Sequence, residues 1–241
     1  MARALQLAAA AMAAEQLRLD AIAHNIANVD TAGFRRVLLA ADAGETIPVY
    51  RRDQPEASLG TLATEPSRYY LALDPRPGAN VVTRDPYDLA IDGDGFLMMQ
   101  GGRLSRGGRL GVDAEGYLTI SGVRVEGASG PVRVGTDQIE IKTDGTVQAK
   151  GNTVGRLRIV SIPTASLEPM GGGLYMVKDP SGLREGGGSV RQGMRERSSV
   201  NPMEEMVEMI NGLRAYETAQ RVMQAVDETT ARLIEQVGRL G

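Results

Sequence analysis

Both ends of the chain carry apolar residues at the spacing of a long amphipathic helix. Near the N-terminus, apolar residues recur every seven positions and would form a stripe along a helix. A neighbouring apolar stripe is interrupted by Glu15. This period predicts a helix from about Arg3 to Asn28, ended by turn-favouring residues such as Gly33. The two stripes consist of Leu5, Met12, Leu19 and Ile26 and of Ala8, Ile22 and Val29.

The C-terminal region opens with a strong helix-start signal. Asn201 is a preferred N-cap, Pro202 needs no backbone donor at the first helical position, and Glu204 can bond back from the third. Gly212 weakens the predicted helix locally. Its apolar stripe consists of Met206, Ile210, Leu213, Tyr216, Met223, Val226, Leu233 and Val237. Because exposure of such apolar stripes to water is unfavourable, the two helices are expected to pack on each other or on other subunits.

Between the helices the apolar pattern changes to the alternation of β-strands. Short alternating runs separated by glycine recur about every 8 to 12 residues, which favours an antiparallel β domain over a βαβ fold. Asp144-Gly145 lies between two such runs, so residues 139–150 form the clearest predicted hairpin. The predicted strands are 89–91, 96–99, 117–120, 123–125, 132–134, 139–142, 146–149 and 157–160.

These patterns predict an α+β fold: an all-β antiparallel central domain with long N- and C-terminal helices that pair as a coiled coil. Residues 1–33 together with 200–241 are expected to form a helical domain, and residues 85–199 the β domain. Residues 34–84 contain five prolines and are expected to be an extended connector, with short β pieces near residues 47–50 and 69–73.

The residue inventory excludes several kinds of chemistry. The chain has no cysteine and one histidine, so disulfides, thiol nucleophiles, cysteine-ligated metals and multi-histidine metal sites are ruled out. His24 has no carboxylate in local register and is expected to be a polar helix residue at an interface. With 27 basic and 30 acidic residues, nothing attracts a phosphate backbone, so no nucleic-acid partner is expected.

Two motifs suggest ligand sites and fail on inspection. Asp92-Gly93-Asp94-Gly95 begins like a calcium-binding loop, but Phe96 stands where the fifth position needs an oxygen ligand. A tight turn before a strand is expected there instead. The glycines at 101–102 and 107–108 lack the spacing and the following helix of a dinucleotide site. No metal, cofactor or catalytic residue is therefore predicted.

The first 14 residues resemble a signal peptide in composition. Gln6 interrupts the apolar run, and the helical period continues to Ile26, which favours a retained helix. No apolar run approaches the length of about 18 residues that spans a bilayer, so no membrane span is expected.

Four blocks of sequence follow one another in a recognisable order. The first is HNIANVDTAGFR at residues 24–35, and the second is DLAIDGDGF at 88–96. Ser105-Arg106 opens the third, which runs to Val125, and the fourth covers residues 199–217. Together they resemble bacterial flagellar basal-body rod and hook proteins, whose first block reads N-[LI]-A-N-x-x-T-x-G-[FY]-[KR]. The chain departs from this family at Leu97 and Leu104, where aromatic residues are common.

The resemblance implies a structural protein without catalysis. Members of this family are exported unfolded by the flagellar type III export apparatus without signal cleavage. They assemble helically into the rod that crosses the periplasm and transmits motor torque, with paired terminal helices on the inside. The partners implied are other copies of the chain, neighbouring rod proteins and the export apparatus.

Within the family, the short length is more similar to the proximal rod subunit, and a distal rod or hook-type axial protein is the alternative. An alternative of another class is a secreted β-rich glycan hydrolase, because paired carboxylates are abundant in a chain of which 24% is charged. The residues expected at the subunit interface are Leu5, Met12, Leu19, Ile22, Asn25, Asn28, Gly33, Phe34, Asn201, Met206, Ile210, Leu213, Arg214, Tyr216 and Met223.

Overall fold

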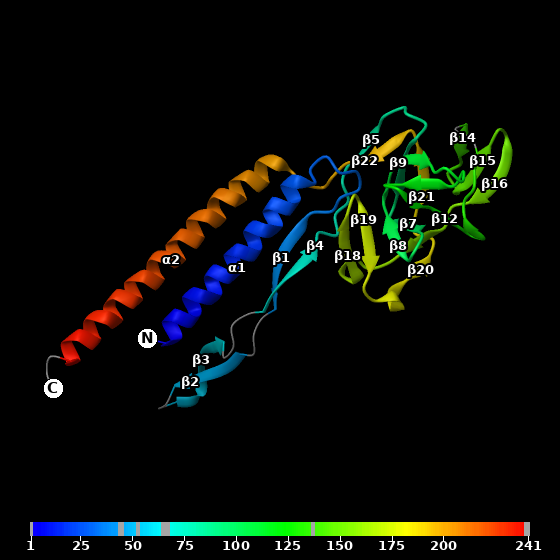
Figure 1. Ribbon diagram of the computed structural model, residues 1–241. Coiled ribbons are helices and arrows are strands. Elements are labelled where there is room, and N and C mark those ends of the chain that lie inside the picture. Colours follow the sequence, from blue (N-terminus) through cyan, green and yellow to red (C-terminus); the bar gives the residue numbers. More distant parts are fainter. Residues whose placement is uncertain (1, 43–45, 52–53, 64–67, 136–137, 239–241) are drawn as a thin grey trace. The chain divides into compact units, whose positions relative to one another are not determined.

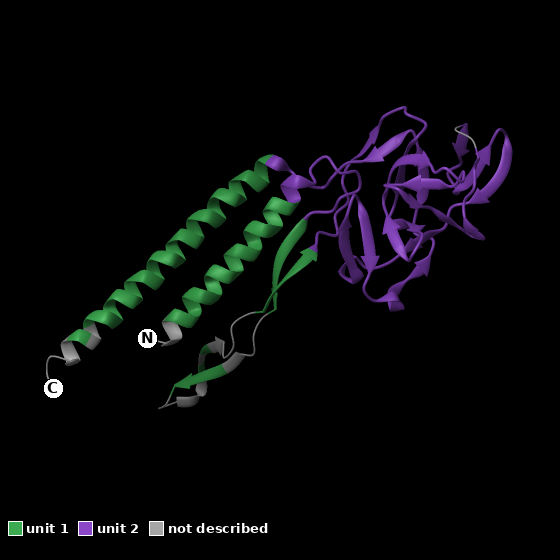
Figure 2. Cartoon of the chain, viewed as in Figure 1, with its two compact units in different colours: residues 1–24, 37–72, 203–241 green, residues 25–36, 73–202 purple. Residues whose placement is uncertain are grey.

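The chain divides into two compact units, each built from segments that are far apart in the sequence (Figure 2). The computed structural model describes residues 2–42, 46–51, 54–63, 68–135 and 138–238. Unit 1 comprises residues 1–24, 37–72 and 203–241, and unit 2 comprises residues 25–36 and 73–202.

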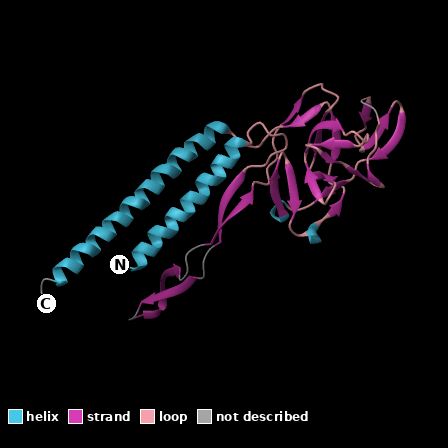
Figure 3. Ribbon diagram, in the orientation of Figure 1, coloured by secondary structure: helices cyan, strands magenta, loops and turns pink. Residues whose placement is uncertain are grey.

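The two terminal helices run side by side (Figures 1 and 3). Helix α1 spans Ala2–Ala27 and helix α2 spans Pro202–Gly238. The first turn of α2 holds Glu204 and Glu205, where the helix dipole favours negative charge. Both predicted helices are confirmed. Neither helix, over its described residues, is apolar over a stretch long enough to cross a membrane.

Two strand pairs follow α1 in the chain. They are β1 (Val37–Asp42) with β4 (Arg68–Leu73), and β2 (Thr46–Arg51) with β3 (Gln54–Ala63). The β pieces expected in this stretch correspond to β2 and β4, whereas β1 and β3 were not anticipated. Every strand of a two-stranded pair is an edge strand, where proline is tolerated, so Pro48 and Pro55 do not prevent pairing.

Unit 2 contains the remaining strands and two short 3-10 turns. They are β5 (Asn80–Val82), β6 (Asp88–Asp92), β7 (Gly95–Met99), β8 (Arg103–Ser105), β9 (Gly107–Val112), β10 (Leu118–Ile120), β11 (Val123–Arg124), β12 (Glu126–Gly127), β13 (Gly130–Pro131), β14 (Ile139–Ile141), β15 (Thr146–Ala149), β16 (Asn152–Arg156), β17 (Ile159–Ser161), η1 (Thr164–Ser166), β18 (Leu167–Gly171), β19 (Leu174–Val177), η2 (Pro180–Gly182), β20 (Arg184–Glu185), β21 (Ser189–Gln192) and β22 (Met194–Glu196).

These strands form antiparallel sheets. The larger sheets have the orders β18-β19-β8-β7-β17-β20, β11-β10-β9-β6-β21 and β14-β15-β16. Two-stranded pairs join β5 to β22 and β12 to β13. The predicted α+β class, with antiparallel sheets between two long helices, is confirmed.

The local predictions for unit 2 mostly agree with the structure. Strands β14 and β15 form the predicted hairpin, and Gly145 takes the positive φ of 85° that its turn requires. The turn expected at Asp92–Gly95 joins β6 to β7. No regular strand forms at residues 132–134, where one is predicted: the segment makes an isolated bridge from Arg133 to Tyr117, and Val132 and Val134 bond through their backbone to residues 116, 118 and 125. Its alternating valines are buried in the core.

Strand β7 separates two apolar clusters of unit 2. Leu97 and Met99 belong to the larger cluster, and Phe96 and Met98 belong to the smaller one. Successive side chains of a strand point to opposite faces, so both faces of β7 are buried. Leu104, like Leu97, is fully buried, so both leucines that replace family aromatics pack in the core.

Candidate subunit interface

One line of weakly exposed residues on α1 and one on α2 follow the alternating three–four spacing of a coiled coil, whereas other buried residues of α1, such as Ala14 and Ala21, lie outside it. We call these two lines of residues the helix seam. On α1 they are Leu5, Ala8, Met12, Glu15, Leu19 and Ile22, and on α2 they are Glu205, Met209, Gly212, Tyr216, Ala219, Met223 and Val226. The two stripes predicted on α1 together make its side of the helix seam.

Gly212 allows a close approach of the two helices. A Cβ at this position would lie 3.1 Å from Leu19 Cδ2 and 3.6 Å from Glu15 Oε2. Glu15 Oε2 is buried without a hydrogen-bond partner among the described residues, and Oε1 lies 3.8 Å from the Arg18 guanidinium. The glycine that weakens α2 in isolation therefore has a packing role.

The stripe predicted on α2 combines two different faces. Tyr216 and Met223 lie in the helix seam, but Met206, Ile210 and Leu213 are 48%, 51% and 48% exposed. Each of these three follows a seam residue by one position, which places it about 100° further around the helix. We call Met206, Ile210 and Leu213 the exposed face of α2. Of the two expected ways of burying the stripe, on the other helix or on other subunits, α1 of the same chain leaves these three residues about half exposed.

The other predicted interface residues lie in several places. Asn201 directly precedes α2 and Arg214 lies within it, and both are exposed, whereas Asn25 is buried and Asn28 is half-buried at the end of α1. The backbone N–H of Asn28 donates to the Asn25 carbonyl over 3.0 Å, and Thr31 donates to Asn28 over 3.1 Å. These bonds form the turn that follows α1, as the asparagine-rich helix end predicts.

Two hydrogen bonds and one close contact fix the position of Gly33 within unit 2. Its φ is +65°, its N–H donates to the Glu196 carbonyl over 2.9 Å, and its carbonyl accepts from the Tyr175 hydroxyl over 2.7 Å. A Cβ here would lie 2.8 Å from Arg106 Cβ, so only glycine fits without a shift. Phe34, the next residue, is buried.

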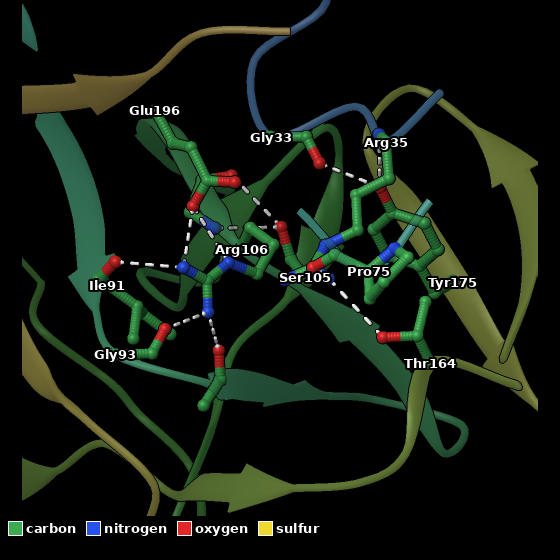
Figure 4. Close-up of polar contacts among 12 residues, drawn as sticks. Gly33, Arg35, Pro75, Ile91, Gly93, Ser105, Arg106, Thr164, Tyr175 and Glu196 are labelled. Carbon is green, nitrogen blue, oxygen red and sulfur yellow. Dashed lines mark hydrogen bonds and ion pairs between the residues drawn. The ribbon is translucent and has the colours of Figure 1, made fainter. Parts of the chain in front are cut away.

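Arg106 and Glu196 form a buried ion pair beside Gly33 (Figure 4). Arg106 Nη2 lies 2.7 Å from Glu196 Oε2, and both side chains are 2% exposed. The other Arg106 hydrogen bonds go to the carbonyls of Ile91, Gly93 and Gly95. The guanidinium therefore ties the β6–β7 turn to β22, which immediately precedes the segment leading into α2.

Tyr175 and Arg35 complete the cluster that we call the polar anchor, which comprises Gly33, Arg35, Arg106, Tyr175 and Glu196. The Tyr175 hydroxyl accepts from the Arg35 N–H over 2.9 Å, and its ring meets Phe96 edge-on, with centroids 5.9 Å apart. Burial raises the pKa of Tyr175 to about 12. Burial, and then the nearby Arg106 charge, lower the pKa of Arg35.

The segments that leave α1 and enter α2 are bonded to each other in unit 2. Ser199 N–H donates to the Phe34 carbonyl over 3.0 Å, and Arg36 N–H donates to Ser199 Oγ over 2.9 Å. With the bond from Gly33 to Glu196, residues 33–36 run alongside residues 196–199. The first and fourth sequence blocks therefore meet where the chain passes to and from its helices.

Gly33, Arg35 and Arg106 are recognisable in the sequence as motif residues but not as one cluster. Tyr175 and Glu196 were missed, because they lie outside the four blocks and have no local pattern that distinguishes them. In the polar anchor these groups bind backbone and one another, and none presents a nucleophile or base to solvent. The two terminal helices pair with each other and leave a further apolar face exposed. This combination is typical of a structural subunit of an assembly.

Comparisons with known proteins agree with this class. Residues 5–35 match the family model described as "Flagella basal body rod protein", and residues 191–236 match "Flagellar basal body rod FlgEFG protein C-terminal". The chain is 32% identical to the flagellar basal-body rod protein FlgF of Salmonella typhimurium, over 91% of this chain and 92% of the relative. It is 30% identical to FlgG of Agrobacterium fabrum, over 94% and 96%, and 28% identical to FlgF of Caulobacter vibrioides, over 92% of each.

The chain belongs to the flagellar basal-body rod protein family. It is a structural subunit of the flagellar basal-body rod and is similar to FlgF. This family is not enzymatic, so the glycan hydrolase considered from the sequence is set aside.

Proposed function

We propose that the chain assembles with copies of itself and with neighbouring rod subunits through its terminal helices, in the proximal part of the rod, and transmits torque there. The observation that carries this proposal is the exposed face of α2. The predicted interface residues on this face remain Met206, Ile210 and Leu213.

The exposed face has the spacing of a second coiled-coil seam. Met206, Ile210 and Leu213 follow one another at intervals of four and three residues, and each is about half exposed. Complete burial of such a side chain stabilises by about 1.5–3 kcal/mol, so roughly half of that is still available at each position. A neighbouring helix with a matching apolar stripe is the partner that this spacing fits.

Helix α1 carries a stripe of this kind away from the helix seam. Leu7 and Leu17 are 59% and 39% exposed, and between them Ala13 is exposed and Ala10 is half-buried, at intervals of three, three and four. A contact between the exposed face of α2 and this stripe on another copy joins two different surfaces. Such heterologous contacts propagate into open helical assemblies when they do not close into a ring.

The proximal position is proposed from the similarity to FlgF. FlgF of Escherichia coli is 32% identical over 92% of its length, and FlgG of Borreliella burgdorferi is 31% identical over 96%. The distal rod therefore remains the alternative position. Cross-linking in isolated basal bodies distinguishes the two, because the identified neighbours are different axial proteins.

Export through the flagellar type III apparatus into the periplasm, without signal cleavage, belongs to the same proposal. It is supported by α1, which runs uninterrupted through the region that resembles a signal peptide and places Leu5, Ala8 and Met12 in the helix seam. Mass spectrometry of the chain from isolated basal bodies should recover the peptide that contains Leu5. A chain that begins after residue 14 would contradict this aspect of the proposal.

The assembly is tested by placing a charge on the exposed face of α2. Ile210→Glu should leave the purified monomer folded, by far-UV circular dichroism, and should prevent its incorporation into basal bodies, as seen by electron microscopy. Val222→Glu is the matched control, because Val222 is 49% exposed on the same helix but lies outside that face. Normal incorporation of the Ile210 variant would refute the proposed interface.

A further inference from the structure

A cavity in unit 2 opens beside the polar anchor. Its volume is ≈ 440 Å³, within the range of about 300–1,000 Å³ in which proteins hold small organic groups. Residues from several strands and loops line it, including Arg35, Phe96, Ile162, Pro163, Thr164 and Arg184. The cavity therefore combines apolar walls with two arginines.

Arg35 is a buried cation on this cavity, and its side-chain hydrogen bonds within the described part of the chain go to neutral groups. The residue is 3% exposed, and its Nη1 donates to the Pro75 carbonyl and, over 3.3 Å, to Thr164 Oγ1 (Figure 4). Its Nε is buried and has no hydrogen-bond partner among the described residues. The guanidinium also lies over the Phe96 ring, 5.4 Å from its centroid.

The acidic residues near Arg35 are bonded elsewhere or exposed. Glu196 Oε2 is bonded to Arg106, whose guanidinium also lies 5.4 Å from the Phe96 centroid, and the opposite charges of this pair offset each other. Asp94 lines the cavity but is exposed. None of the ion pairs found among the described residues includes Arg35. Because a buried charge without a counter-charge is unfavourable, this site favours an incoming anion.

We propose that this cavity receives the carboxylate of an aspartate or glutamate side chain from a neighbouring rod subunit. The proposal rests on the proposed function, since it needs assembled subunits. The incoming carboxylate pairs with the Arg35 guanidinium, the hydroxyl of Thr164 lies within the same site, and Phe96, Ile162 and Pro163 cover the methylene groups. Arg184 supplies a second, exposed charge at the same cavity.

The carboxylate chemistry is tested on the purified full chain. Blocked glutamate (N-acetyl-glutamate N-methylamide) should shift the Arg35 Nε–Hε resonance in ¹⁵N NMR, whereas blocked glutamine should not. Arg35→Lys keeps a charge and should retain weakened binding, and Arg35→Gln should abolish it, both followed at the backbone amide of Thr164 because these variants lack the Arg35 Nε–Hε group. Arg109→Gln is the matched control, because it removes an exposed arginine of the same unit. An Arg35 resonance that does not respond to blocked glutamate would overturn the proposal.

The protein source of the carboxylate is tested in isolated basal bodies. The chain has no cysteine, so Ser161→Cys, on the wall of the cavity, and Ile210→Cys each create a unique thiol for a short cross-linker. Ser161→Cys should cross-link to a peptide of a neighbouring subunit that contains an acidic residue. Replacing that acidic residue by its amide should weaken the contact roughly tenfold or more, the usual effect of losing a charge-assisted bond.

The two thiols separate failure of this inference from failure of the proposed function. Cross-links from Ile210→Cys without any from Ser161→Cys would overturn the inference and leave the assembly proposal standing. No cross-link from Ile210→Cys would count against the assembly itself. Binding of blocked glutamate without a cross-link from Ser161→Cys would mean that a carboxylate from another source occupies the cavity, and would overturn the commitment to a subunit.

Discussion

Replacing Gly33 by alanine tests the close contact that holds the segment after α1 on unit 2. Alanine at a φ of +65° carries a backbone strain of about 1–2 kcal/mol. The new Cβ would also lie 2.8 Å from Arg106 Cβ, an atom that cannot move away without its backbone. Overlaps of this kind cost about 1–3 kcal/mol, so the variant should lose about 2–5 kcal/mol of unfolding free energy.

Gly122→Ala is the matched control, because Gly122 has a φ of +76° and nothing within 4 Å of the position of a Cβ. It should lose only the strain of about 1–2 kcal/mol. Native-state amide exchange read at the buried strand β7 reports the unfolding free energy of unit 2 for both variants. If Gly33→Ala lowers the unfolding free energy read at β7 no more than Gly122→Ala does, the close contact with Arg106 does not contribute to the loss of stability and the reasoning is refuted.

Three further substitutions test other features of the structure. Arg106→Met leaves the Glu196 carboxylate buried without its counter-charge and should destabilise unit 2 by about 3–5 kcal/mol, measured by the same exchange experiment. Tyr175→Phe removes a hydroxyl that makes two hydrogen bonds and should cost about 1–3 kcal/mol at neutral pH. Because the pKa of Tyr175 is raised to about 12 in the folded chain, from about 10 when unfolded, the neutral phenol stabilises the fold fully below pH 10, and this contribution is lost between pH 10 and 12. Gly212→Leu should force the helices apart at Leu19 and cost about 1–3 kcal/mol, seen as faster amide exchange in α1.

Each of these expectations has its own control. The double variant Arg106→Met/Glu196→Met should recover part of the lost stability, and a double variant as unstable as the single one would contradict the ion-pair argument. The wild-type chain and Tyr175→Phe should converge in stability as pH rises to 12, and parallel profiles would contradict the assignment to Tyr175. Gly212→Ala should have little net effect, because the gain of up to about 1 kcal/mol in helix propensity opposes a contact that Leu19 can relieve.

The ends of the chain were largely predictable because helical signals are local. The apolar period, the Asn201-Pro202 start and the glycine after α1 depend on residues within a few turns of one another. The same holds for the hairpin at residues 139–150, whose turn sequence allows few other conformations. Residues 132–134 show the limit of such reasoning, since their alternation predicts burial on one side, but they form an isolated bridge and single backbone bonds instead of a regular strand.

The polar anchor could not be predicted from the sequence. Arg106 and Glu196 are 90 positions apart, and isolated charged residues are most often exposed. Gly33 and Arg106 both belong to the family blocks, but nothing in the sequence indicates that Gly33 lies directly against Arg106 Cβ. Tyr175 joins this cluster from β19, where its hydroxyl reaches across to the segment after α1.

Local residue patterns are sufficient to specify two terminal helices, an antiparallel β region and the motifs of a flagellar rod subunit. The face of α2 that meets α1 is defined only once the chain is folded. The seam residues and the exposed face share the same three–four spacing and differ by a single position, so periodicity does not distinguish them. Gly212 settles the choice, since its missing side chain admits Leu19 and leaves Met206, Ile210 and Leu213 uncovered.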